Sequence, residues 1–212
     1  MQNYNKTDGL IMGVMSLFYI FGAIQLGHPE MRALYAGMTP WVLLLSILFL
    51  SFYDQTQQRL KLLFFMLLVA VVSFVVEVCG VATGVVFGSY SYGAELGVKV
   101  ADTPLIIGVN WVLLIYLSAA MLSSFPRSPL YWIVLPSALM VGYDVVMEQV
   151  APRMGMWSWG GDVVPLQNYA VWAFLALLFH TLRYVMNISV RNKMALFLFS
   201  IQFFFFSIIL IV

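Results

Sequence analysis

Seven apolar runs, each long enough to cross a bilayer or nearly so, constrain the fold of this sequence more than any other feature. A helix needs roughly 20 apolar residues to span the hydrocarbon core, and polar or Gly- and Pro-containing breaks separate the runs. The predicted spans are residues 10–26, 34–53, 62–80, 104–123, 130–150, 170–187 and 195–212. The sequence therefore predicts an all-α fold, a polytopic membrane bundle of about seven transmembrane helices.

The composition agrees with a membrane protein. Of 212 residues, 63% are hydrophobic and 9% are charged, whereas about a quarter of a soluble protein is charged. Seven spans use the whole chain, so residues 1–212 are expected to form a single integral membrane domain. The net charge of +1 leaves no basic patch for nucleic acid, and the lipid bilayer is the expected partner. The first run lacks a clear small-x-small cleavage site and is interpreted as a retained helix.

Two runs have special features. Pro136 lies inside the fifth predicted span, where the missing backbone N–H predicts a bend. The last run contains four consecutive phenylalanines and is apolar on every side, so we expect that helix to face lipid.

The positions of Lys and Arg predict the orientation, because cytoplasmic loops are enriched in both. Alternating loops place seven basic residues on one side and three on the other. The first group is Lys6, Arg59, Lys61, Arg127, Arg183, Arg191 and Lys193, and the second is Arg32, Lys99 and Arg153. We expect a bacterial inner membrane protein with its N-terminus in the cytoplasm and its C-terminus outside. The two longest connections, 81–103 and 151–169, then share the non-cytoplasmic side.

Acidic residues within the predicted spans are the candidates for function, because ionisable groups in a membrane are costly. Glu77 lies near the end of the third span. Asp144 and Glu148 lie four residues apart near the end of the fifth and so share one helix face. The orientation brings these three acids to a similar depth in the outer leaflet, where Asp102 and Asn110, at the start of the fourth span, are also expected. No basic residue is assigned to the interior of a span.

This arrangement allows two interpretations. Burial and repulsion between like charges both favour the protonated form of a carboxyl group, and a carboxylic acid that stays protonated near neutral pH can act as a general acid. The acids then serve catalysis or proton transport. In the second interpretation they hydrogen-bond to backbone or water and hold the helices together.

Other residues add less. A single acidic pair with few basic neighbours does not fit a Mg²⁺-dependent pyrophosphate enzyme, and one cysteine, Cys79, excludes a multi-thiolate site, so no metal is expected. The aromatic residues Tyr90, Tyr92, Trp157 and Trp159 fit an interfacial belt. They equally fit a site that stabilises a carbocation through its aromatic faces.

Two blocks of this sequence resemble a known family. The first block is Glu77 to Gly93, followed by Leu96, Gly97 and Pro104. The second consists of Asp144, Glu148, Gly155, Trp157, Trp159, Pro165, Asn168 and Trp172. Together they cover roughly residues 74–172 and resemble the membrane carotenoid-biosynthesis family that includes bisanhydrobacterioruberin hydratase and γ-carotene 1′-hydroxylase. The first two spans and the last resemble this family only in hydropathy.

The resemblance implies hydration of the terminal carbon–carbon double bond of an acyclic carotenoid end, which gives a tertiary alcohol without a cofactor. The implied substrate is similar to lycopene or γ-carotene, and other carotenoid enzymes are candidate partners. The expected acid–base core is Glu77, Asp144 and Glu148. The expected substrate- and water-positioning residues are Asp102, Asn110, Tyr90, Tyr92, Trp157, Trp159 and Asn168.

Two alternatives remain open at this point. The first is a carotenoid cyclase, which begins with the same protonation, or another carotenoid end-group enzyme. A small proton-coupled transporter or an isoprenoid-binding membrane protein would use the same acids as a proton relay.

Overall fold

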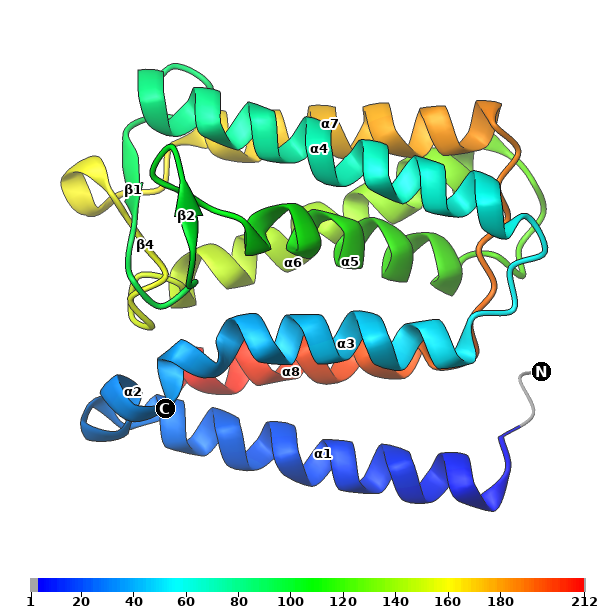
Figure 1. Ribbon diagram of the computed structural model, residues 1–212, viewed down its shortest axis with the longest axis horizontal. Coiled ribbons are helices and arrows are strands. Elements are labelled where there is room, and N and C mark those ends of the chain that lie inside the picture. The colour runs from blue at the N-terminus through cyan, green and yellow to red at the C-terminus, as the bar shows by residue number, and fades with distance from the viewer. Residues whose placement is uncertain (1–3, 212) are drawn as a thin grey trace.

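Each predicted span is a helix in the computed structural model, which describes residues 4–211 (Figure 1). The helices are α1 Lys6–Gly27, α2 Pro29–Tyr35, α3 Thr39–Tyr53, α4 Arg59–Thr83, α5 Ile106–Met121, α6 Leu135–Val150, α7 Leu166–Val185 and α8 Ala195–Ile211. The all-α membrane-type bundle predicted from the apolar runs is therefore confirmed.

Hydropathy separates the helices into groups. Among the described residues, four helical segments are long and apolar enough to cross a membrane: Lys6–Gly27, Ala36–Tyr53, Arg59–Thr83 and Leu130–Val150. The helices α5 and α8 are apolar but shorter. The helix α7 is as long as a span, but it carries buried Asn168, His180 and Arg183 on its inner face.

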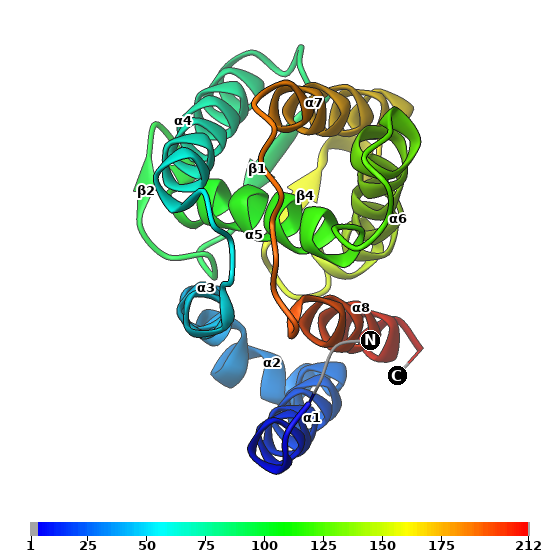
Figure 2. The ribbon, with the colours of Figure 1, turned by 90° about the vertical axis from the view of Figure 1, so that its right-hand side faces the viewer.

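The helix α8 corrects one expectation. It was expected to face lipid, yet it lies between α1 and the pair α5 and α6 (Figure 2). Leu198, Phe199 and Gln202 are buried in these contacts, while Phe204 stays exposed. A helix that is apolar on all sides can be buried on several faces as readily as it can face lipid, so its composition alone did not decide its place.

Pro136 lies in the first turn of α6, directly after a π-helical turn, Leu130–Val134. Proline has no N–H for the carbonyl four residues earlier, which here belongs to Trp132. The Arg183 guanidinium donates to that carbonyl from Nη2 at 2.6 Å and also lies over the Trp132 ring. Arg183 on α7 thus supports α6 where the bend was predicted.

Two short antiparallel ribbons lie at one end of the bundle (Figure 1). In the first, β1 Tyr90–Tyr92 pairs with β4 Trp157–Trp159. In the second, β2 Lys99–Val100 pairs with β3 Thr103–Pro104. The first ribbon joins the two longest connections, which confirms that they share one end of the molecule.

Candidate active site

The ribbon formed by β1 and β4 presents four aromatic side chains to the bundle. Side chains alternate along a strand, so the Tyr-Ser-Tyr and Trp-Ser-Trp triplets turn their aromatic residues to one face and their serines to the other. Ser91 and Ser158 are exposed on the outer face. The strands approach closely at Gly93, where an added Cβ would clash with the Gly155 carbonyl oxygen, so only glycine fits there.

Glu77 on α4 accepts three hydrogen bonds. The hydroxyls of Tyr90 and Tyr92 donate to its Oε2 at 2.7 and 2.8 Å. The indole nitrogen of Trp111 on α5 donates to its Oε1 at 3.2 Å. Glu77 is buried, so neutral donors from the ribbon and from α5 replace water around both of its oxygens.

Glu148 on α6 is held in the same way. The indole nitrogens of Trp157 and Trp159 donate to its Oε2 at 2.9 and 2.7 Å. The amide of Asn168 on α7 donates to its Oε1 at 3.1 Å. Each strand of the ribbon therefore provides hydrogen-bond donors to one acid: β1 donates to Glu77, and β4 donates to Glu148.

Asp144 lies one helical turn before Glu148 and is fully buried. Its Oδ2 accepts a long bond of 3.4 Å from Asn168, and its Oδ1 has no hydrogen-bond partner among the described residues. Asn168 thus links the two acids of α6, and one oxygen of Asp144 is left without a donor.

The tyrosines of β1 stay protonated beside this cluster. Burial, and after it the neighbouring Glu77, raises the pKa of the Tyr90 and Tyr92 phenols well above their ordinary value. Both hydroxyls therefore remain hydrogen-bond donors to Glu77 over the physiological pH range.

The acid cluster has neither a cation nor a metal-binding arrangement within residues 4–211. The ion pair found in that range, Lys193 with Asp8, joins the start of α8 to α1. No group of three or more His, Cys, Asp or Glu side chains in that range is placed to hold a metal ion. The acids are stabilised by neutral N–H and O–H donors instead.

A small chamber lies between Glu77 and Glu148. Its cavity volume is about 20 Å³, which is enough for one water molecule. Asn110, Asn168 and the four ribbon aromatics also line it, together with Phe87, Ile107, Met147 and Trp172. Asp144 is not part of this lining and is linked to it through Asn168.

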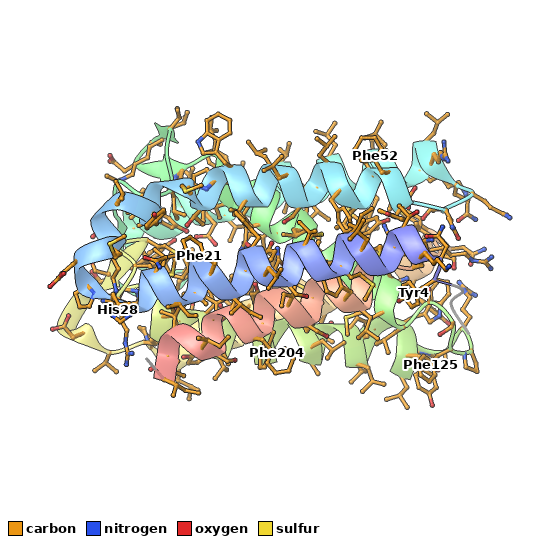
Figure 3. All side chains as sticks on the ribbon, turned by 90° about the horizontal axis from the view of Figure 1, so that it is seen from below. Tyr4, Phe21, His28, Phe52, Phe125 and Phe204 are labelled. Atoms are coloured by element: carbon orange, nitrogen blue, oxygen red, sulfur yellow. The ribbon has the colours of Figure 1, made fainter. Side chains whose placement is uncertain are left out.

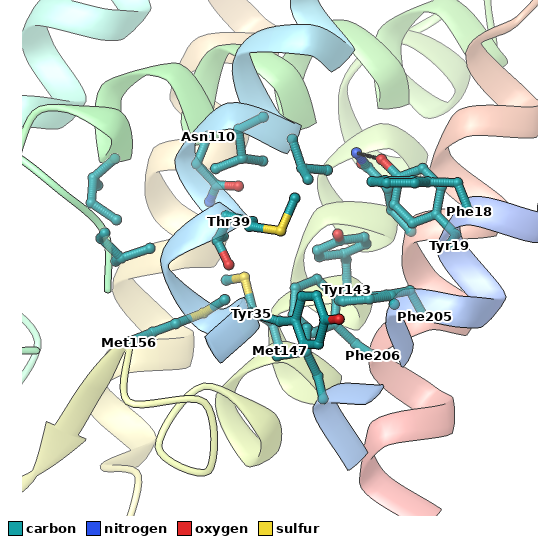
Figure 4. A pocket seen from close by; sticks show the side chains of 18 of the residues that line it. Phe18, Tyr19, Tyr35, Thr39, Asn110, Tyr143, Met147, Met156, Phe205 and Phe206 are labelled. Atoms are coloured by element: carbon teal, nitrogen blue, oxygen red, sulfur yellow. Dashed lines mark hydrogen bonds between the residues drawn. The ribbon is translucent and has the colours of Figure 1, made fainter. Parts of the chain in front are cut away.

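A larger apolar pocket adjoins the chamber (Figure 4). Its cavity volume is about 150 Å³, and it lies among α1, α3, α5, α6 and α8. Four residues line both spaces, namely Ile107, Asn110, Met147 and Trp157. An apolar ligand in the pocket would therefore have its end close to the two acids.

Most of the residues singled out from the sequence meet here. Glu77, Glu148 and Asp144 come together as expected, and Asn110 lines both spaces. Asp102 departs from expectation, because it is exposed in the β2–β3 turn with a φ of 59° and lines neither space. The backbone reverses between the two strands, which turns Asp102 away from the bundle.

The interfacial-belt interpretation of the aromatics needs correction. Trp157 and Trp159 are buried, and their N–H groups bind Glu148. Trp111, whose indole N–H donates to Glu77, was not singled out from the sequence. The signal that could have found it is that a buried indole N–H needs an acceptor. The face of α1 that lines the pocket was overlooked as well, because nothing in an evenly apolar helix marks it.

Comparison with known proteins gives one match. A family model described as "Carotenoid biosynthesis protein" matches residues 38–212, which include the chamber and leave α1 outside. No curated protein and no solved structure matches the chain.

Proposed function

Since this chain belongs to the carotenoid biosynthesis protein family, we propose that it is a membrane enzyme that adds water to the terminal double bond of an acyclic carotenoid end. The product is a tertiary alcohol, and the reaction needs no redox cofactor. Residues 38–212 carry the family match and all the acids of the chamber.

The observation that carries this proposal is the chamber itself. Two carboxyl groups, Glu77 and Glu148, border a space for one water molecule, and an apolar pocket shares lining residues with it. Hydration of an alkene needs these three components: an acid, a water molecule and a dry site for the hydrocarbon.

The proposed reaction has two steps. One chamber carboxyl gives its proton to the CH carbon of the terminal double bond, whose π electrons form the new C–H bond and leave a tertiary cation. The water oxygen then bonds to the cationic carbon, and the released proton goes to a chamber carboxylate. The carboxyl groups lose one proton in the first step and regain one in the second. The net reaction is therefore the addition of water to the alkene to give the alcohol.

The surrounding residues have separate roles in this proposal. The aromatic faces of Tyr92 and Trp157 stabilise the cation. Glu77 and Glu148 each accept three hydrogen bonds, which fixes their positions relative to the water. Asp144 acts on Glu148 through their shared partner Asn168 and is a positioning residue.

The space for water also bears on the choice between hydratase and cyclase. In both reactions an acid protonates the same double bond, but in a cyclase the polyene itself captures the cation, and a bound water would compete with ring closure. A chamber that has room for water beside the acids favours hydration.

Pigment analysis tests the proposal. Cells that make lycopene and express this chain should accumulate a carotenoid heavier by one water, and Glu148→Gln should abolish it. Asp162→Asn is the matched control, because Asp162 is an exposed acid in the β4–α7 connection, and asparagine also tolerates its positive φ.

Two other outcomes would replace the proposal. A ring-ended product of unchanged mass would identify a cyclase. Unchanged carotenoids, together with proton-coupled solute uptake by reconstituted vesicles, would identify a transporter.

A further inference from the structure

We propose that the apolar pocket receives the end of a linear isoprenoid chain sideways from the bilayer, between α1 and α3, and that Gly22 on α1 limits the size of the end group admitted. The choice of a linear isoprenoid rests on the proposed function. The route and the role of Gly22 rest on the geometry of the pocket.

The pocket runs from the acid chamber to the space between α1, α3 and α8. Asn110 and Met156 line one part of it, and Tyr19 and Phe18 line another part (Figure 4). The Tyr19 hydroxyl lies in a buried polar group with Ser46 and Gln202. Apart from this polar group, the lining along α1 is apolar, so a chain whose end lies at the chamber has an apolar path there.

The packing of α1 leaves part of its side toward α3 available, next to the hydrogen bond between Tyr19 and Ser46 of α3. The helix α1 packs along α8 and α2, whereas α3 packs along α5. Phe18 and Phe21 of α1 and Met38 before α3 line the pocket and are exposed as well. Figure 3 shows this face, with Phe21 labelled on α1. The rim is therefore apolar, as access from the hydrocarbon core requires.

The lining favours a neutral hydrocarbon over a phospholipid. Among the described residues, no side chain that lines the pocket belongs to Asp, Glu, Lys, Arg or His, so a charged headgroup would find no partner there. Three of the lining residues are methionines, Met38, Met147 and Met156, whose flexible side chains adapt to a long apolar chain.

Gly22 is the lining position where the size of the pocket can be changed without touching the acids. An added Cβ there would meet Phe205 Cε2 at 3.5 Å, an ordinary contact, and no other described atom within 4 Å beyond its chain neighbours and the nearby backbone of α1. Alanine therefore fits, while a longer side chain must occupy the pocket. Gly22 also lies outside residues 38–212, which match the family.

Binding of lycopene to the purified full-length protein in detergent tests the role of Gly22. Gly22→Leu should bind lycopene about tenfold or more weakly than the wild type, because overpacking of a filled pocket is costly. Gly22→Ala should weaken binding less than Gly22→Leu, because its single methyl group makes only an ordinary contact with Phe205. Gly13→Leu is the matched control, because Gly13 is exposed on the same helix and has no atom within 4 Å of an added Cβ. Unchanged binding by Gly22→Leu would overturn the role of Gly22.

Photolabelling of the wild type tests the route and does not depend on the folding of a variant. A linear isoprenoid that carries a diazirine should label peptides of α1 and α3, and excess lycopene should compete with it. Labelling confined to the outer faces of α4 and α7 would overturn the proposed route.

The two proposals fail in different ways. If the wild type hydrates carotenoids and Gly22→Leu binds lycopene normally, the inference about the pocket is wrong and the reaction stands. If the wild type hydrates nothing while lycopene binding still depends on Gly22, the reaction is wrong and the pocket stands.

Discussion

Tyr90 on β1 lies directly opposite Trp159 on β4, and their ring centroids are 5.1 Å apart, yet the two side chains donate to different acids. The Tyr90 hydroxyl bonds to Glu77 and the Trp159 indole to Glu148, each at 2.7 Å. Because Glu77 belongs to α4 and Glu148 to α6, the ribbon fixes the position of one acid relative to the other.

The first prediction concerns this coupling. Tyr90→Phe and Trp159→Phe should each lower kcat more than they raise KM, because each releases one acid from its position without removing an acid. In the double variant the loss should be smaller than the product of the two single losses, since residues that act as one unit are not additive. Tyr131→Phe is the control, because Tyr131 stacks on Phe125 away from the chamber. A loss of kcat in the double variant equal to the product of the two single losses would contradict the coupling of the two acids through the ribbon.

The second prediction separates the two acids of α6. Glu148→Gln should lower the free energy of unfolding by about 1–3 kcal/mol, because an amide nitrogen must then face one of the N–H donors. Asp144→Asn should cost clearly less, because its Oδ1 has no donor among the described residues. Thermal unfolding in detergent measures the difference. Equal losses would mean that Asp144 has partners comparable to those of Glu148.

Much of this architecture could be predicted from the sequence, since the helices follow from uninterrupted apolar runs. The meeting of Glu77 with Asp144 and Glu148 followed from their similar depth, which the order of the spans determines. For a residue just outside a span, the order of the spans gives its depth but not the direction of its side chain. Asp102 was therefore expected in the site, although it lies in an exposed turn. The pairing of β1 with β4 was also missed, because two three-residue strands about 65 residues apart carry no local signal of each other.

The third prediction concerns Arg183 and Pro136. Arg183→Met should lower stability by about 2 kcal/mol or more, because the carbonyls of Trp132 and Ile188 lose the hydrogen bonds that the guanidinium donates. Pro136→Ala supplies a backbone N–H near the Trp132 carbonyl, so it should recover part of that loss in the Arg183→Met background. A double-mutant cycle by thermal unfolding measures the recovery. Equal effects of Pro136→Ala in both backgrounds would exclude the proposed link.

The fourth prediction is topological. The seven-to-three division of basic residues predicts that a reporter inserted near Arg127 reports the cytoplasm and that one fused after Val212 reports the outside. Arg127 lies at the end of the bundle opposite the ribbons, where it donates to the Tyr184 carbonyl. The reverse pattern would place the chamber in the inner leaflet.

The central claim is that water captures a cation at the end of an acyclic carotenoid. The most direct measurement incubates the purified protein with lycopene in ¹⁸O-labelled water, without nucleotide or flavin, and determines the mass of the product. The account predicts a tertiary alcohol whose hydroxyl oxygen carries the label. A hydroxyl oxygen that comes from dioxygen, or a cyclic product with no added oxygen, would contradict it.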